Sequence, residues 1–422
     1  MELIRPFRGL RPRPDVVAQV AAPPYDVLSS AEARALVVGN PLSFLHLSKP
    51  EVDLPEGTAA EATEVYAQGR ANLAAMLRAG VLVQDDSPCY YAYRLESPTH
   101  ALTGLVAAAS VAAYENGDIR RHEFTRKAKE DDRTRMIDTM GAQTGPVMLA
   151  WRTSDTLRAC LASACTGAPA LDCQAVDGVR HRLWVIRDAQ AVDAISRAAA
   201  GIPRLYIADG HHRAASAARV AQARRAAAPA GSAVPSSDAL AEHFLAVIFA
   251  HDDMQVLDYN RLVADLQGQT RAGFLARLAE LGTLQPEAQP VRPAASGTFG
   301  IYLPDQWYRL TLPAASIPAD DPIARLDVSL LADRVLGPLL GIQDPRTDAR
   351  IDFVGGARGL GELAARVDSG EMAVAFALYP TRVEDVMAVS DQGDVMPPKS
   401  TWFEPKLADG MVSYLLANAP RP

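Results

Sequence analysis

The sequence predicts a mixed fold of the α+β class, in which helices alternate with strands and some strands pair as antiparallel hairpins. Strand-like and helix-like segments follow one another through residues 145–228, which is typical of layered α/β units. Two apolar segments at 88–96 and 102–115 predict antiparallel pairing beside these units. The composition, with 49% hydrophobic and 22% charged residues, is that of a globular protein with a sizeable core.

The 422 residues are enough for two or three domains. We expect an N-terminal α/β region at 1–150, a central segment at 151–255 and a C-terminal α+β region at 256–422. In the first region, Ser29 or Ser30 predicts the start of a short helix. The further expected elements are a helix at 60–79, strands at 88–96 and 102–115, an Asn-Gly turn, and a change from strand to helix near Arg126.

The central segment repeats this alternation. Its expected elements are strands at 145–151, 181–188, 204–210 and 243–250, helices at 154–163, 189–201 and 211–228, and a loop or flexible insertion at 228–238. The C-terminal third mixes short strands and helices without internal repeats.

Charge and cysteine content exclude several classes of protein. The net charge of −8 argues against general attraction to nucleic acid or anionic membranes. The four cysteines form no Cys-x-x-Cys pair, so we expect unpaired thiols in a reducing compartment. The N-terminus has no apolar signal core, and the longest apolar run, LVAAASVAAY, is too short to span a membrane. We therefore expect a cytoplasmic protein without membrane association.

The densest polar motif lies at a strand-to-helix turn in RLYIADGHHRAASAARV. A helix that begins directly after a strand exposes backbone N–H groups and forms an anion site with its dipole. Gly210 allows a tight turn and close approach of a ligand, and Arg213 can fork onto a phosphate. Asp209 can act as a base or hold Mg²⁺, and His211 or His212 can donate to phosphate or carry protons. Alternatively, Asp209 only caps the helix and the histidines belong to a local hydrogen-bond network.

A second charged motif, RRHEFTRKAKEDDRTR, follows a predicted strand. Its candidate site residues are Arg121, His122, Glu123, Lys129, Asp132 and Arg133. If the later part is helical, Lys129 and Arg133 share a face and can bind an anion that Asp132 helps to orient. A run of mixed charge is also typical of a solvated helix surface, and the pattern alone favours that alternative.

Two further motifs begin with Pro-Pro. In MPPKSTWFEPK, Lys399, Ser400 and Thr401 can contact a phosphate, although the glycine framework of a P-loop is missing. In APPYDVLSS, Tyr25 and Asp26 can line a pocket. The alternatives are an ordinary proline-rich loop for the first motif and a structural turn for the second.

Taken in order, PPYDV, RHEFT with KEDDR, ADGHHR and MPPKSTWFEPK resemble a prokaryotic family known only as a domain of unknown function, over nearly the whole chain. The strand, the Asp-Gly-His-His-Arg turn and the helix more narrowly resemble the core motif of free serine kinases with a ParB/sulfiredoxin-like fold. This resemblance implies such a core around the turn, with additional α/β elements at both ends. It also implies that residues 209–213 contact nucleotide phosphates. It does not locate the acidic base, for which Glu123 is our first candidate and Asp26 the second.

The favoured hypothesis is a kinase that transfers a phosphoryl group from ATP or ADP, with Mg²⁺, to the hydroxyl of free serine or a similar small metabolite. Arg213 with Lys129 or Arg133 would neutralise the transferred charge. The alternative is a nucleotide-binding regulator of the ParB-like class without turnover, and a third option is a metabolite-binding protein without chemistry. The acceptor, the nucleotide and the oligomeric state, with a homodimer among the options, stay open. We expect residues 121–133 and 396–406 to converge on the 209–213 turn.

Overall fold

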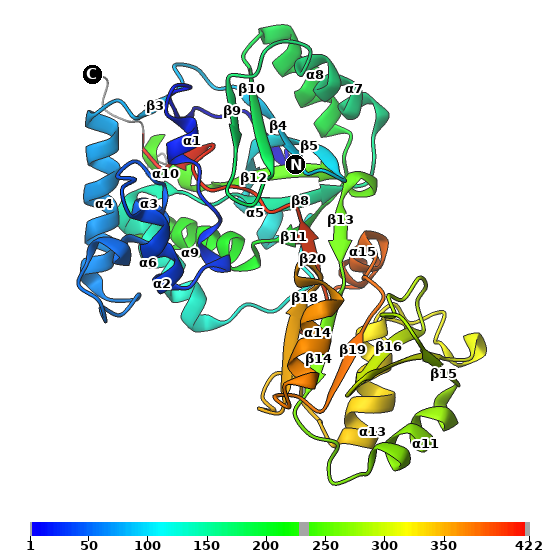
Figure 1. Cartoon of the computed structure of the whole chain (residues 1–422). Coiled ribbons are helices and arrows are strands. Elements are labelled where there is room, and N and C mark those ends of the chain that lie inside the picture. The colour runs from blue at the N-terminus through cyan, green and yellow to red at the C-terminus, as the bar shows by residue number, and fades with distance from the viewer. Residues whose placement is uncertain (1, 228–235, 418–422) are drawn as a thin grey trace. The chain divides into compact units, whose positions relative to one another are not determined.

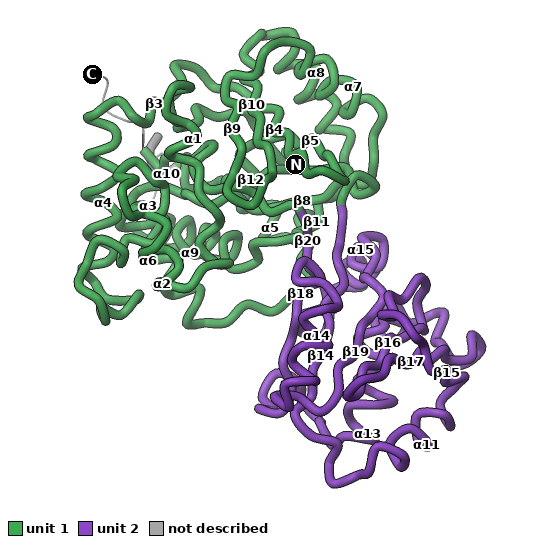
Figure 2. The backbone as a smooth tube through the Cα atoms, viewed as in Figure 1, with its two compact units in different colours: residues 1–254, 405–422 green, residues 255–404 purple. Residues whose placement is uncertain are grey.

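The computed structural model describes residues 2–227 and 236–417. Contacts divide the chain into two compact units, which Figure 2 distinguishes by colour. Unit 1 comprises residues 1–254 and 405–422, and unit 2 comprises residues 255–404. Unit 2 is therefore inserted between two parts of unit 1. Most of the loop expected at 228–238 lies outside the described residues.

Unit 1 is built on a mixed sheet that has nine strands in the described part of the chain (Figure 1). The strand order is β6-β11-β8-β12-β5-β4-β10-β9, with β1 added against β5. Parallel pairs join β11 to β6 and β12 to β8, and the other pairs are antiparallel. The strands are β1 (Ile4–Arg5), β4 (Tyr90–Glu96), β5 (Ala101–Ser110), β6 (Ile119–Arg120), β8 (Val147–Trp151), β9 (Leu171–Gln174), β10 (Arg180–Ile186), β11 (Leu205–Asp209) and β12 (His243–Ala250). The sheet thus joins strands from both the 1–150 and the 151–255 region.

Helices cover this sheet because its central strands are apolar on both faces. Four helices share one buried cluster with the sheet: α5 (Val111–Glu115), α7 (Asp155–Ala164), α8 (Ala189–Ala200) and α9 (His211–Ala227). The α9 helix also packs against α6 (Lys127–Met140). Five of its eight buried residues are alanine, and these small side chains let α9 fit closely between the sheet and α6. This packing brings the start of α9 beside the β6–α6 loop.

A smaller antiparallel sheet in unit 1 has the order β3-β2-β21-β7 among the described strands. Its strands are β2 (Gly9–Pro12), β3 (Leu82–Gln84), β7 (Ala142–Gln143) and β21 (Ser413–Leu415). The remaining helices of unit 1 are α1 (Val17–Val20), α2 (Ser30–Val37), α3 (Leu45–Ser48), α4 (Thr63–Arg78) and α10 (Ser236–Ala241). Because β21 follows unit 2 in sequence, this sheet ties the C-terminal segment back into unit 1.

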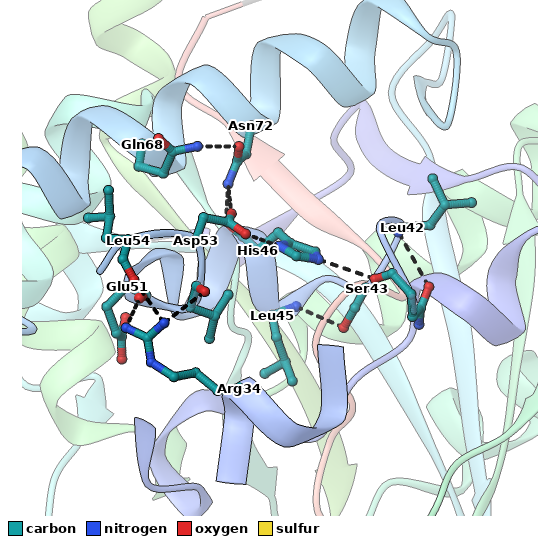
Figure 3. Close-up of polar contacts among 12 residues, drawn as sticks. Arg34, Leu42, Ser43, Leu45, His46, Glu51, Asp53, Leu54, Gln68 and Asn72 are labelled. Atoms are coloured by element: carbon teal, nitrogen blue, oxygen red, sulfur yellow. Dashed lines mark hydrogen bonds and ion pairs between the residues drawn. The ribbon is translucent and has the colours of Figure 1, made fainter. Parts of the chain in front are cut away.

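A polar network fixes the segment between α2 and α4, and Figure 3 shows its contacts. The Nδ1 atom of His46 lies 2.7 Å from Oδ1 of Asp53. Asn72 of α4 donates to Oδ2 of Asp53 at 2.7 Å and to the carbonyl of His46 at 2.8 Å. Arg34 of α2 donates to the carbonyl of Val52 at 3.0 Å. Two helices therefore hold α3 in place by satisfying its backbone and that of the following turn.

Unit 2 has a six-stranded antiparallel sheet of order β15-β17-β16-β19-β14-β18 in the described residues, and a β13–β20 pair. Its strands are β13 (Gln255–Leu257), β14 (Tyr259–Val263), β15 (Thr283–Glu287), β16 (Thr298–Leu303), β17 (Gln306–Thr311), β18 (Ile351–Gly355), β19 (Val374–Ala377) and β20 (Trp402–Glu404). Its helices are α11 (Arg271–Leu281), α12 (Asp327–Leu331), α13 (Gly337–Leu340), α14 (Gly359–Asp368) and α15 (Val383–Asp391).

The mixed α/β class and most predicted elements are confirmed, and one element needs correction. The strand expected at 102–115 ends at Ser110, and α5 occupies its last five positions. The Ser110 side chain accepts a hydrogen bond from the backbone N–H of Ala113, which starts the helix. None of the four cysteines forms a disulfide. No helix in residues 2–227 or 236–417 combines the length and apolarity that a membrane-spanning segment needs.

Gly104 of β5 provides a test of how tightly this sheet is packed. A Cβ atom there would lie 2.6 Å from a ring carbon of Phe249 and 2.8 Å from Val247. We expect Gly104→Ala to lower the free energy of unfolding by about 1–3 kcal/mol, because the strands must shift to admit the methyl group. Gly167→Ala, where no atom lies within 4 Å of the new carbon, is the control. Equal urea midpoints for the two variants would contradict this packing.

Candidate functional site

The turn between β11 and α9 depends on a glycine. Gly210 has a φ of +94°, a left-handed conformation that side-chain-bearing residues rarely adopt. A Cβ atom at this position would also lie 2.9 Å from Nε of Arg213. The guanidinium of Arg213 therefore folds back over the turn into space that only glycine leaves open.

Asp209, the last residue of β11, is held between two cations. Its Oδ2 atom lies 3.2 Å from Nζ of Lys406, and its Oδ1 atom lies 3.7 Å from a terminal nitrogen of Arg213. Burial alone would raise the pKa of Asp209, but Lys406 and Arg213 outweigh it and hold this pKa below its ordinary value. The carboxylate is therefore ionised at neutral pH. Lys406 is the last residue of the MPPKSTWFEPK motif and is not among the residues that the sequence predicts to contact phosphate.

The two adjacent histidines each accept a hydrogen bond from the backbone of the β6–α6 loop. Nε2 of His211 accepts from the N–H of His122 at 3.4 Å, and Nε2 of His212 accepts from the N–H of Arg126 at 2.9 Å. Burial lowers the pKa of both rings, and the nearby His122 lowers that of His211 further. In the neutral state that this favours, each ring carries its proton on Nδ1. The pair therefore fixes the loop that carries Glu123.

His122 is itself buried, and its ring crosses that of His211 edge-on at 4.4 Å between centroids. Burial lowers the pKa of His122 to about 4, although the backbone of Ile207 and the charge of Asp209 oppose this shift. Both histidines are therefore neutral at pH 7, and they shape the site without adding positive charge to it.

Two carboxylates lie at the rim of the turn. Oε2 of Glu123 faces Nδ1 of His211 at 3.7 Å, and half of the Glu123 side chain is exposed. Oδ2 of Asp26 lies 3.5 Å from a terminal nitrogen of Arg213. Arg213 thus neutralises Asp26, whereas one of the groups that face Glu123 is an uncharged imidazole. Of the two predicted bases, Glu123 is the more accessible to a substrate hydroxyl.

Arg133 of α6 brings a further cation to this region. Its guanidinium lies over the ring of Tyr25, 4.4 Å from the centroid, and its Nε donates to Asp132 at 2.7 Å. A small pocket is lined by Tyr25, Arg133, Gln143, Thr144, Gly145 and Arg213, among others. Two guanidinium groups thus face one pocket, which is a geometry suited to an anion with several oxygens.

Asp409 is another residue that the sequence did not indicate, and it is buried. Its Oδ2 atom accepts from the backbone N–H of Tyr25 at 3.2 Å. Its Oδ1 atom has no hydrogen-bond partner among the described residues, although the Ser48 hydroxyl, at the end of α3, lies close enough to favour the ionised form. Burial raises the pKa of Asp409 to about 7, even though the charge of Arg213 lowers it.

The structure brings together most, but not all, of the predicted site residues. Lys129 is exposed and close enough to lower the pKa of His212, while Arg121 is exposed next to Tyr114. Asp132 is buried, accepts from Tyr66 at 3.0 Å and orients Arg133.

Unit 2 contains the other candidate residues of the MPPKSTWFEPK motif, which are Lys399, Ser400 and Thr401. The exposed Lys399 side chain lies over the ring of Tyr259 at 5.5 Å. The Ser400 hydroxyl donates to the carbonyl of Pro397 at 2.6 Å, and the Ser400 carbonyl accepts from Thr381 at 2.8 Å. The contribution of Lys399, Ser400 and Thr401 to a phosphate site stays a prediction.

No group of three or more His, Cys, Asp or Glu side chains in the described residues is arranged to hold a metal ion. Asp209 is the carboxylate that the sequence predicts as a ligand of Mg²⁺. Mg²⁺ commonly binds through one or two carboxylates together with substrate phosphates, so an ion at Asp209 would require Lys406 to move away from its Oδ2 atom.

Comparisons with known proteins identify a family and distant structural neighbours. The family described as "Protein of unknown function (DUF1015)" matches residues 4–329. No curated protein matches the chain. A free serine kinase variant in complex with AMP is 13% identical with a TM-score of 0.32, covering 71% of this chain and 87% of that one. SbnI with a C-terminal truncation, from Staphylococcus aureus, is 11% identical with a TM-score of 0.34, covering 71% and 82%. A conserved hypothetical protein from Pyrococcus furiosus is 15% identical with a TM-score of 0.31, covering 74% and 95%.

The raised pKa of Asp409 predicts a pH-dependent loss of stability. Because its pKa is about 7 in the folded protein and near 3.8 when unfolded, the native state holds its proton more tightly. Stability from this group is therefore lost as the pH rises from about 4 to about 7. We expect Asp409→Asn to be more stable than the native protein at pH 8, by at most about 4 kcal/mol, and the gain to shrink towards pH 4. Urea unfolding of both proteins across this range would measure it. A difference independent of pH would contradict the assignment.

Proposed function

The chain belongs to the DUF1015 family of proteins of unknown function, and we propose that it is a nucleotide-dependent kinase that phosphorylates the hydroxyl of free serine or a similar small metabolite. The gathering of Arg133, Arg213 and Lys406 around the start of α9 carries this proposal. Phosphoryl transfer needs positioning and charge neutralisation more than covalent chemistry, and this cluster offers both.

The start of α9 is the proposed phosphate site. The first turn of a helix leaves backbone N–H groups without intrahelical partners, and its dipole favours negative charge. Gly210 leaves room at this turn for the guanidinium of Arg213. Arg213 is buried and its neighbouring carboxylates raise its pKa, so its positive charge is permanent. Lys406, placed by Asp209, adds a second cation on the other side of that carboxylate.

Glu123 is the proposed general base. The imidazole of His211 carries its proton on Nδ1, the atom that faces the Glu123 carboxylate, so the ring can orient that carboxylate. As the acceptor oxygen forms its bond to the terminal phosphorus, the bond from that phosphorus to the leaving nucleotide oxygen breaks. The hydroxyl proton moves to Glu123. Asp26 is the second candidate, disfavoured by its pairing with Arg213.

Several finer assignments belong to the same proposal. Asp209 would hold Mg²⁺ together with the nucleotide phosphates, and the ion would add positive charge near the transferred group. Lys129 would reach the nucleotide from the exposed side of α6. The resemblance of the ADGHHR motif supports a ParB/sulfiredoxin-like core around β11 and α9. ATP and ADP are both candidate donors.

The first test measures turnover by the full chain with ATP or ADP, Mg²⁺ and L-serine, with phosphorylated product detected by mass spectrometry. We expect Lys406→Met and Asp209→Asn each to lower kcat by about 10²–10³-fold, because each removes a charge aimed at the phosphates or the metal. Lys127→Met is the control, since this lysine is 85% exposed and pairs only with Asp131 among the described contacts.

Native turnover in both site variants would exclude the proposed site. Nucleotide binding without turnover in the native protein, across a panel of small hydroxy acids and amino acids, would favour the regulator alternative. Thermal unfolding of each variant separates loss of chemistry from loss of fold.

The second test concerns the base. We expect Glu123→Gln to lower kcat by about 10²-fold or more and to remove the acidic limb of the pH–rate profile, with the KM for nucleotide little changed. Asp26→Asn should retain that acidic limb. If Asp26→Asn removes the acidic limb and Glu123→Gln retains it, Asp26 is the general base and Glu123 is not.

A further inference from the structure

Unit 2 contains a pocket of its own, which shares no residue with the proposed kinase site. Its volume is about 210 Å³. This is room for about seven water molecules, and so for a small metabolite. The polar residues that line it include Ser296, Arg325, Asp327, Thr381, Arg382 and Asp385. Ile317 and Leu326 provide apolar wall.

A buried carboxyl group lies at this pocket. Asp327 is only 6% exposed, and its Oδ1 atom accepts from the Ser296 hydroxyl at 2.6 Å and from the Gly297 N–H at 2.8 Å. Its Oδ2 atom has no hydrogen-bond partner among the described residues, although the backbone of Tyr379 is near enough to favour ionisation. Leaving a buried carboxylate oxygen without a donor is costly, so a ligand that donates to it would be favoured.

The second carboxylate of the pocket, Asp385, binds two arginine side chains. Arg325 donates to Oδ1 of Asp385 at 2.8 Å, and Arg382 donates to the same carboxylate through two nitrogens at 2.9 and 3.0 Å. The Nε atom of Arg325 has no hydrogen-bond partner in the described part of the chain. Each guanidinium has five N–H donors. The hydrogen bonds to Asp385 therefore leave several N–H groups of Arg325 and Arg382 that can bind an anionic group.

The charges of the pocket select against simple ions. Asp327 and Asp385 disfavour a lone anion, while Arg325 and Arg382 disfavour a lone cation. A ligand that carries both charges, a few ångströms apart, satisfies the carboxylate oxygen and the guanidinium groups together.

We propose that this pocket binds a small zwitterion of the α-amino-acid class, with its ammonium group at Oδ2 of Asp327 and its carboxylate at Arg325 and Arg382. The ligand side chain would lie against Ile317 and Leu326. Charge-assisted hydrogen bonds at both ends would set orientation, and the apolar wall would set which side chains fit.

Calorimetric titration of the full chain tests this. Burial raises the pKa of Asp327 to about 6, so the titration is run at pH 8, where the carboxylate is ionised. The probes are L-alanine, L-valine and L-leucine, which have no hydroxyl for the proposed kinase site, each beside its amide, which lacks the negative charge, and its N-acetyl form, which lacks the positive one. We expect at least one amino acid to bind, and both of its blocked forms to bind about tenfold more weakly or worse.

Substitutions in the pocket test whether the amino acid binds there. Asp327→Asn and Arg382→Gln should each weaken it by about tenfold or more. Asp333→Asn, an exposed position outside the pocket, should not weaken it. Asp209→Asn in unit 1 should retain it, which separates this pocket from the kinase site. If Asp327→Asn fails to fold, Arg382→Gln decides, because that side chain is 58% exposed.

Three results would overturn the proposal. The first is that none of the three amino acids binds. The second is that the blocked forms bind as well as their parents. The third is that binding survives in Arg382→Gln or is lost in Asp209→Asn, because either outcome places the ligand elsewhere.

Discussion

The left-handed backbone at Gly210 is the constraint on which the candidate site depends. It lets β11 pass into α9 within one residue, so that Asp209 ends the strand and Arg213 lies one turn along the helix. The absent Cβ also gives Arg213 room to fold back over the turn. With any larger residue, the arginine would leave its position between Asp26 and Asp209, and both carboxylates would lose their nearest guanidinium.

The histidines of the ADGHHR motif take part in a local hydrogen-bond network, which is one of the two interpretations that the sequence left open. Adjacent histidines beside an arginine look like a cluster of positive charge, yet burial keeps His211 and His212 neutral. Each ring accepts a hydrogen bond from a backbone N–H of the β6–α6 loop, and these bonds hold that loop near the turn. The positive charge comes instead from arginines and a lysine contributed by three separate segments.

The local sequence pattern was sufficient to predict most helices and strands and the ADGHHR motif. It was insufficient where contacts between distant parts of the chain decide which residues lie at the site. Strand β11 and helix α9 follow from an apolar run, a glycine and an alanine-rich segment. Helix α5 was missed because its residues are as apolar as the strand before it, and only the Ser110 cap separates them. Lys406 and Asp409 carry no local signature; they matter because the segment after unit 2 returns to unit 1. Segment 396–406 was expected to reach the 209–213 turn, but the residues selected in it were Lys399, Ser400 and Thr401, and not Lys406.

The insertion of unit 2 has a consequence for biosynthesis. During translation, residues 1–254 emerge from the ribosome before residues 405–417 are synthesised. The later segment supplies Lys406, Asp409 and the strand β21. Unit 1 therefore stays incomplete while the 150 intervening residues are translated. During this time its smaller sheet lacks strand β21, and Asp209 lacks the neighbouring Lys406. Any message truncated within unit 2 yields a product that holds the ADGHHR motif but not the cation beside it. The order of synthesis thus keeps an incomplete chain from assembling the whole site.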